Sequence, residues 1–349
     1  MKKVTIDGRD ISPAHKPYII AELSANHNGN LDRALQTIEM AKDAGADAIK
    51  LQTYTPDTMT IDCNKEDFQV KGGLWDGYSL YKLYEWAHTP YDWHKAMFEK
   101  AREVGITVFS TPFDETAVDL LEVLDAPAYK IASFELVDIP LIKKVAKTGK
   151  PMIMSTGMAN EEEIAEAVKC ARDNGCNELV VLHCISSYPA PVGQSNLATI
   201  KVIADKFDCV VGLSDHTLGT VVSVASVCMG ASLIEKHVTL SRKDKGPDSE
   251  FSLEPEELKH LCSETESAWR AIGEAGFERK PVEEASMKFR RSIYFVKDME
   301  AEQIITGEDI RRIRPGFGLS PKYYDDLIGR KVKGRIERGT AAAWELINE

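Results

Sequence analysis

The chain has 349 residues, of which 43% are hydrophobic and 28% charged, values that suit one large globular domain with a smaller second one. Its net charge of -12 argues against a nucleic-acid partner, because nucleic-acid binders normally carry a basic face. No run approaches the length of a transmembrane span, and polar sequence rather than an apolar signal segment follows Met1. The seven cysteines form no CxxC pairs, which indicates reduced thiols. We therefore expect a soluble, cytoplasmic protein that contacts neither nucleic acid nor membrane.

Short apolar runs alternate with amphipathic segments along most of the chain. A β-hairpin is expected at residues 4–11, with Asp7 and Gly8 as its turn. The runs predicted as strands cover residues 18–23, 47–52, 106–109, 128–131, 151–154, 178–183, 210–213 and 232–236. The segments predicted as helices include residues 31–44, 90–104, 114–124, 139–146, 160–173 and 255–272. Eight strands, each followed by a helix, predict a (β/α)8 TIM barrel. An open doubly wound sheet is the alternative, but the first strand lacks the glycine-rich turn of that fold.

The composition changes toward the C-terminus. We place the barrel domain, with its N-terminal hairpin, at residues 1–275 and a polar linker at residues 276–285. Residues 286–349 are rich in Arg and Lys, and glycines interrupt their short apolar pieces. This pattern predicts a small second domain built of short strands and turns.

Two histidines stand at the ends of neighbouring predicted strands. His216 follows the seventh strand and His237 follows the eighth, with a helix-sized segment between them. Parallel neighbouring strands end side by side, so the two imidazoles are expected to lie close enough to share a metal ion. The alternative is that His216 caps the next helix and His237 hydrogen-bonds a neighbour. The spacing supports the metal only moderately, because no compact HxxxH motif is present.

Lysines occur inside two otherwise apolar strands. Lys50 and Lys130 are expected to be buried, and a buried lysine requires a partner. Each could simply form a salt bridge with an internal carboxylate such as Glu22. Hydroxyl side chains at the same ends of the strands favour an anion site instead, and these are Thr111, Ser133, Ser155 and Ser214. The residues alone thus indicate a barrel enzyme that binds a phosphorylated or carboxylated substrate beside a two-histidine metal.

Several of these segments together resemble the sialic acid synthase family. The matching stretches are residues 20–29 (IAELSANHNG), 45–52 (GADAIKLQ), 129–133 (YKIAS), 155–157 (STG), 211–216 (VGLSDH), 235–237 (EKH), 246–248 (GPD) and 314–316 (RPG). The resemblance covers the whole chain and implies a barrel followed by a C-terminal antifreeze-like (SAF) domain. Within the family the chain most resembles the pseudaminic acid synthases, through residues 71–75 (KGGLW) and 248–253 (DSEFSL). Ser186 and Ser249 stand where the neuraminate synthases carry Asn and His.

The resemblance implies a transferase that condenses phosphoenolpyruvate with an amino-sugar aldehyde and releases phosphate. For a pseudaminic acid synthase the aldehyde is 2,4-diacetamido-2,4,6-trideoxy-L-altrose, and the product belongs to bacterial surface glycans. The alternatives are an N-acetylneuraminate or legionaminic acid synthase of the same mechanism. More remote alternatives are a metal-dependent barrel hydrolase or isomerase, which has no need of two strand-end lysines, and a non-enzymatic binding protein.

The resemblance also assigns the candidate site residues. Those implied for phosphoenolpyruvate are Lys50, Gln52, Thr111, Lys130, Ser133, Ser155 and Ser214. Those implied for the sugar are Asn26, Ser186, Tyr188, Asp248 and Arg314. Glu22, His216 and His237 are implied as catalytic, and the two histidines as ligands of Mn2+ or Mg2+, with Co2+ as a further candidate. Arg314 would reach the partner subunit's substrate, which implies a domain-swapped homodimer.

Two further features have open interpretations. The long insertion after the second strand contains Trp75, Tyr81 and Tyr84, whose spacing favours packing against the barrel rim over a lid above a deoxy-sugar. Cys184 is expected to be a buried structural thiol rather than a nucleophile, since no base is evidently placed to activate it.

Overall fold

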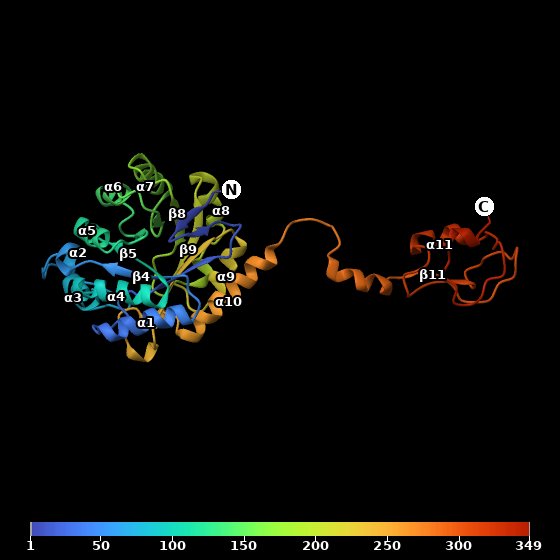
Figure 1. Ribbon diagram of the computed structural model, residues 1–349, viewed down its shortest axis with the longest axis horizontal. Helices are drawn as coiled ribbons and strands as arrows, with labels where there is room; N and C mark the ends of the chain where they lie inside the picture. The colour runs from blue at the N-terminus through green and yellow to red at the C-terminus, as the bar shows by residue number, and fades with distance from the viewer. Residues whose placement is uncertain (1, 349) are drawn as a thin grey trace. The chain divides into compact units, whose positions relative to one another are not determined.

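The computed structural model describes residues 2–348, which divide between Gly273 and Glu274 into two compact units (Figure 1). The first unit contains the predicted barrel, and the second contains the predicted small domain. Residues 274–286 are exposed, and a 3-10 helix, η5 (Pro281–Phe289), begins within the segment expected as a linker.

Eight parallel strands close into a barrel, which confirms the predicted fold. The strands are β3 (Tyr18–Glu22), β4 (Ala48–Thr53), β5 (Thr107–Pro112), β6 (Tyr129–Ile131), β7 (Met152–Ser155), β8 (Leu179–Cys184), β9 (Val210–Asp215) and β10 (Leu233–His237). The first and last of these pair with each other, with Glu22 opposite His237. Apart from that closure the order in space follows the order in the chain, as expected when each crossover is right-handed and short.

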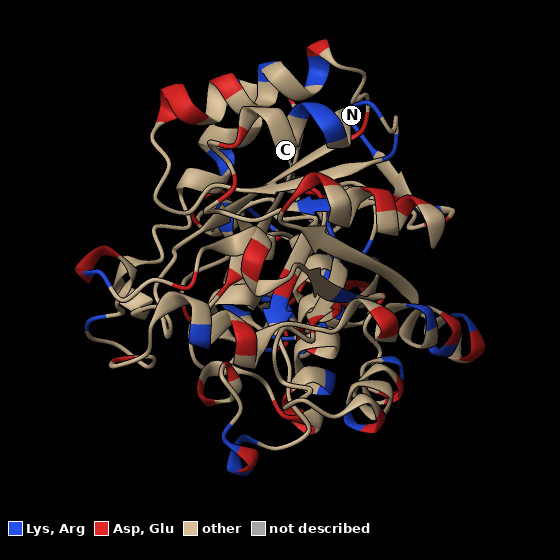
Figure 2. Cartoon of the chain, turned by 90° about the vertical axis from the view of Figure 1, so that its left-hand side faces the viewer, with Lys and Arg blue, Asp and Glu red and all other residues tan. Residues whose placement is uncertain are grey.

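Helices connect the strands and surround the barrel (Figure 1). They are α1 (Leu31–Asp43), α4 (Tyr91–Val104), α5 (Glu115–Val123), α6 (Ile139–Ala146), α7 (Glu161–Asp173), α8 (Thr199–Phe207), α9 (Val221–Cys228) and α10 (Pro255–Ile272). Helix α7 illustrates how the sequence sets its bounds, because Asn160 and Glu163 form a capping box at its start. Charges of both signs are interspersed over the outer helices in the view of Figure 2. No helix within residues 2–348 is long and apolar enough to cross a bilayer.

The interior of the barrel is apolar at its N-terminal end. Strands β1 (Val4–Ile6) and β2 (Arg9–Ile11) form the predicted hairpin, whose Val4, Ile6 and Ile11 join the inward-facing apolar residues of the barrel in one cluster. Close packing in this layer requires a glycine at position 212, because a Cβ atom there would lie 2.2 Å from the carbonyl oxygen of Leu233. Since side chains alternate along a strand, the next inward positions form the layer above, toward the C-terminal ends.

The insertion between β4 and α4 forms two short helices, α2 (Pro56–Met59) and α3 (Leu80–Ala87). The side chain of Ser79 caps α3 by accepting a hydrogen bond from the backbone of Lys82.

The second unit contains an antiparallel pair of strands, β11 (Ser292–Phe295) and β12 (Ile310–Ile313), together with 3-10 helices and the short helix α11 (Tyr324–Leu327). Its own core includes Ile293, Phe295, Ile310, Leu327 and Ile336.

Candidate active site

A layer of charged side chains fills the C-terminal end of the barrel interior. It comes from inward positions in the C-terminal half of the barrel, and its charged members are Glu22, Lys50, Lys130 and Glu235, each at most 4% exposed. Side chains two residues apart on a strand point to the same face. Ile20, Ala48, Ala128 and Leu233, each two residues before one of these charged residues, lie in the apolar layer below, so the charged side chains also point into the barrel.

Ion pairs join these four side chains into one network. Lys50 Nζ lies 2.7 Å from Glu22 Oε2 and 3.9 Å from Glu235 Oε2, and it donates a hydrogen bond of 3.0 Å to Thr111 Oγ1. Lys130 Nζ lies 3.2 Å from Glu235 Oε1, which also accepts a 3.1 Å hydrogen bond from Ser214. Both interpretations of the lysines, as salt-bridge partners and as parts of an anion site, therefore agree with the structure. Each lysine has a carboxylate partner, and both lie beside hydroxyl groups.

The two carboxyl groups of the network differ in proton affinity. Burial raises the pKa of Glu22 to about 7, against the opposing charge of Lys50. Burial also acts on Glu235, but Lys130 and Lys50 outweigh it and lower the pKa of that carboxyl. Burial lowers the pKa of Lys130. Near neutral pH, Glu235 is thus the fixed anion of the layer, and Glu22 is the carboxyl poised to exchange a proton.

Hydroxyl groups on β7 and on the loops after β6 and β8 lie at the same end of the barrel as this layer. Ser155 Oγ is buried and has no hydrogen-bond partner among residues 2–348. Ser133 accepts a 3.1 Å hydrogen bond from the backbone N–H of Gly157. A Cβ atom at Gly157 would lie 2.1 Å from Ser186 Oγ, so only glycine allows these groups to approach each other. An unpaired buried hydroxyl at the same end of the barrel as two lysines suits an oxyanion ligand.

The histidines at the ends of β9 and β10 face each other. The ring centroids of His216 and His237 are 5.4 Å apart. Nδ1 of His216 lies 3.0 Å from the carbonyl oxygen of Ile185, so a proton on Nδ1 leaves Nε2 free as a ligand. Nδ1 of His237 is buried without a hydrogen-bond partner among the described residues, and burial lowers the pKa of His237 well below its ordinary value. The neutral His237 with its free Nδ1, beside His216 with its free Nε2, fits a divalent metal.

A cavity of about 400 Å³ opens above the charged layer. Its lining includes Gln52 and His237 from the strand ends and Tyr188 and Asp248 from the loops. Gln52 donates a 3.0 Å hydrogen bond to Glu22 Oε1, which connects the cavity to the layer below. Burial raises the pKa of Asp248, whose carboxylate accepts a hydrogen bond from Ser24. Polar groups of the cavity are thus connected to the charged layer beneath it.

Comparison with known proteins assigns the chain to a family. The sequence model of the NeuB family matches residues 37–276, and that of the SAF domain matches residues 290–348. The chain belongs to the NeuB family. A pseudaminic acid synthase of Campylobacter jejuni (strain 81-176) is 44% identical over 329 residues, which cover 93% of this chain and 95% of the relative. A pseudaminic acid synthase of Helicobacter pylori is 39% identical over 325 residues, which cover 93% of this chain and 96% of that enzyme.

The fold agrees with this assignment. The crystal structure of an N-acetylneuraminic acid synthetase from Leptospira borgpetersenii in complex with citrate matches with a TM-score of 0.74 at 32% identity, covering 83% of this chain and 96% of that chain. The resemblance found in the motifs of the sequence is therefore confirmed for this NeuB-family chain.

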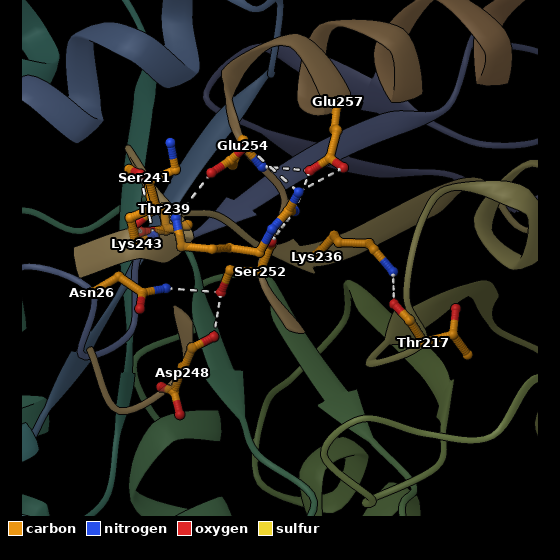
Figure 3. A network of polar contacts seen from close by, with 11 residues as sticks. Asn26, Thr217, Lys236, Thr239, Ser241, Lys243, Asp248, Ser252, Glu254 and Glu257 are labelled. Atoms are coloured by element: carbon orange, nitrogen blue, oxygen red, sulfur yellow. Dashed lines mark hydrogen bonds and ion pairs between the residues drawn. The ribbon is translucent and has the colours of Figure 1, made fainter. Parts of the chain in front are cut away.

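Asn26, one of the predicted sugar ligands, does not line the cavity. The side chain of Asn26 donates hydrogen bonds to Val238 O and Ser252 Oγ and accepts one from Ser249, so it braces the loop that carries Asp248 (Figure 3). Arg314 is exposed in the second unit, after β12. His216 lies next to His237 at the end of β9, and the remaining predicted site residues of the barrel unit lie in the charged layer, in the adjoining hydroxyl groups or in the cavity lining.

Three functional candidates were missing from the expected set. Glu235 pairs with both lysines, and the alternation that places His237 inward also places Glu235 inward, a signal that was available in the sequence. Glu135 lines the cavity, and burial raises its pKa to about 7. Cys184 is buried as expected, and its Sγ lies 3.8 Å from Nδ1 of His216, a neighbour that the sequence did not indicate.

Proposed function

We propose that this chain is a pseudaminic acid synthase, which condenses phosphoenolpyruvate with 2,4-diacetamido-2,4,6-trideoxy-L-altrose and releases phosphate. The observation that carries the proposal is the buried pair Lys50 and Lys130, close to His237 and its neighbour His216. A barrel hydrolase would need the histidines but not the lysines. The pseudaminic acid synthases at 44% and 39% identity support the choice of sugar.

The charged layer suits phosphoenolpyruvate. The phosphate and carboxylate would accept hydrogen bonds from Lys50, Lys130 and the unpaired hydroxyl of Ser155, and both would remain shielded from water. Gln52, Thr111, Ser133 and Ser214 complete the proposed set for this substrate. Binding of this anion would also offset the positive charge that the layer carries when Glu22 is protonated.

The reaction joins carbon three of phosphoenolpyruvate to the aldehyde carbon, and water then adds to carbon two. The tetrahedral intermediate loses phosphate by cleavage of the C–O bond, so the products are the nonulosonic acid and inorganic phosphate. Glu22 would take the proton of the attacking water, a role that its raised pKa near neutrality suits. Lys50 and Lys130 would stabilise the departing phosphate.

His216 and His237 would hold a divalent ion, Mn2+ or Mg2+ with Co2+ as a further candidate. When bound, it would supply Lewis acidity at the aldehyde oxygen, where negative charge develops. Tyr188 and Asp248 would orient the sugar from the cavity wall, and Arg314 would reach it from the second unit of a partner subunit. We therefore propose a domain-swapped homodimer, and the seven free cysteines suit the reducing cytoplasm.

The test is phosphate release from phosphoenolpyruvate with Mn2+, supplying separately the trideoxy-altrose, its legionaminic-pathway counterpart and N-acetylmannosamine. We expect the altrose to be preferred by at least about tenfold in kcat/KM, the scale on which pockets distinguish such groups. Lys130→Met should lower kcat by about 10²-fold or more, because it removes a charge from the departing phosphate. Lys147→Met, at an exposed lysine after α6, is the matched control. Preference for N-acetylmannosamine would contradict the proposed sugar, and release without any sugar would contradict the reaction.

A further inference from the structure

One side of the cavity is lined by apolar side chains from the insertion and the loops around it. These are Leu80, Leu83, Tyr84 and Ala87 of α3 together with Phe113 and Phe134, and we call this set the apolar wall. The sequence favoured packing of the insertion against the barrel rim over a lid. The structure places it against the cavity, so its side chains are available to a bound molecule.

The apolar wall is held in place by contacts of its own. The ring of Tyr54 packs edge-on against Tyr84 and against Phe113, with centroid distances of 5.8 and 5.1 Å. Leu83 is only 8% exposed. Trp75 Nε1 donates a 3.0 Å hydrogen bond to the carbonyl oxygen of Pro247, which ties the insertion to the loop that carries Asp248. The wall is therefore preformed, and a ligand does not need to order it.

Two polar side chains mark the floor of the cavity. Gln52 and His237 project from strand ends above the charged layer, and the reacting aldehyde must approach this floor to meet phosphoenolpyruvate. The aldehyde is one end of the open-chain sugar, so the other end extends away from the floor. In the trideoxy sugar that other end is a methyl group, carbon six, which is bonded to the hydroxyl-bearing carbon five, and the second acetamido group is on carbon four.

We propose that the apolar wall recognises the deoxygenated C6 end of the sugar and thereby selects 6-deoxy sugars over 6-hydroxy sugars. This inference rests on the proposed function. Burial of a methyl against Leu80 and Phe134 is favourable, whereas a hydroxyl there must be desolvated. The Tyr84 hydroxyl and the Glu135 carboxyl interrupt the lining. The expected discrimination is therefore that of a largely apolar pocket, about 10-fold to 100-fold in kcat/KM.

The experiment compares two aldehydes of identical configuration, the 2,4-diacetamido-2,4,6-trideoxy sugar and its 6-hydroxy counterpart, by phosphate release with the full-length enzyme. Two variants place a hydroxyl in the wall, Phe134→Ser and Leu80→Ser. Phe134 is 58% exposed, so its replacement disturbs no core. The matched control is Val137→Ser, because Val137 is a similarly exposed apolar residue in the same loop, at 61%, and does not line the cavity. Melting temperatures verify that each variant is folded.

We expect the wild-type enzyme to prefer the 6-deoxy sugar and both wall variants to reduce that preference by about fivefold or more, mainly through a lower kcat/KM for the 6-deoxy sugar. The control should keep the wild-type ratio. Equal use of both sugars by the wild-type enzyme, or an unchanged ratio in both folded wall variants, would overturn the role of the wall while leaving the synthase activity standing. Failure of the wild-type enzyme to release phosphate with either sugar would overturn the proposed function and this inference with it.

Discussion

At the scale of single residues, the two carboxyl groups of the charged layer differ in their partners. Glu235 contacts both lysines and Ser214, whereas Glu22 has one lysine and the amide of Gln52. Both are buried to the same degree, so the difference in their pKa values arises from the number of positive charges nearby rather than from burial. Glu235 is thus the permanent counterion of the lysines, and Glu22 is a separate group that exchanges a proton.

Glu22→Gln should abolish the part of the pH dependence of activity that arises from ionisation of Glu22. A general base works only when ionised, so kcat/KM of the wild-type enzyme should rise with pH through about 7, the pKa of Glu22. The kcat of the variant should be about 10²-fold lower, and the rise of its kcat/KM with pH through about 7, the ascending limb of the pH profile, should vanish. The measurement is phosphate release between pH 5 and pH 9.

Glu135→Gln is the matched control, because burial raises the pKa of Glu135 to about 7 as well. If that variant loses the limb and Glu22→Gln keeps it, Glu22 is not the base. Stability gives a second readout. In the unfolded chain Glu22 releases its proton near 4.5, so between pH 4.5 and 7 the folded state binds more protons and the free energy of unfolding falls as the pH rises. Glu22→Gln should lessen that fall.

At the scale of elements, the strand ends of β9 and β10 are joined by a buried ion pair on the outer face of the barrel. Lys236 lies opposite Asp215, and its Nζ is 2.8 Å from Asp215 Oδ2. Nζ also donates a 2.5 Å hydrogen bond to the carbonyl oxygen of Thr217 (Figure 3). His216 and His237 are the next residues along these strands. The ion pair between Lys236 and Asp215, on the opposite face of the strands, therefore fixes the spacing of the two imidazoles.

Lys236→Met should therefore loosen the proposed metal site and destabilise the fold. The substitution leaves Asp215 buried without its cation, which costs about 3–5 kcal/mol of unfolding free energy. Because supporting residues orient metal ligands, Mn2+ affinity should fall about 10-fold to 100-fold. Denaturant unfolding and Mn2+ titration by electron paramagnetic resonance measure the two effects. Lys243→Met, at an exposed lysine in the loop after β10, should change neither. Unaltered Mn2+ affinity in folded Lys236→Met would show that the pair does not position the histidines.

The sequence predicted the strands and helices themselves better than it predicted the contacts between them. Apolar runs and amphipathic segments identified the eight strands and located the polar groups at their C-terminal ends, because alternation and the barrel fold are local and repetitive signals. The contacts between strands were not local. Whether Lys50 would pair with Glu22 or remain free for an anion depended on register and on Glu235, a residue nearly two hundred positions away. The position of α3 over the cavity likewise depended on tertiary contacts of Trp75 and Tyr54.

At the scale of the whole molecule, the chain divides its proposed functional residues between two units. The charged layer, the histidines and the cavity belong to the first unit, whereas Arg314 belongs to the second. Arg314 is exposed and β12 lacks a carboxylate of its own, since its residues are Ile310, Arg311, Arg312 and Ile313. A guanidinium of this kind is available to a substrate only if its unit docks over a barrel, either in the same chain or in a partner.

Mixing two inactive variants distinguishes these arrangements. Lys130→Met removes a residue of the barrel and Arg314→Ala removes the arginine, and each alone should have little activity. In a domain-swapped dimer the intact barrel of one chain receives Arg314 from the other, so mixed dimers should recover up to about a quarter of the wild-type activity after subunit exchange. If the arginine acts within its own chain, mixing should restore nothing. Arg312→Ala, at an exposed arginine on β12, replaces Arg314→Ala in the control and should be active by itself. Sedimentation of the fully active enzyme as a monomer would contradict the dimer directly.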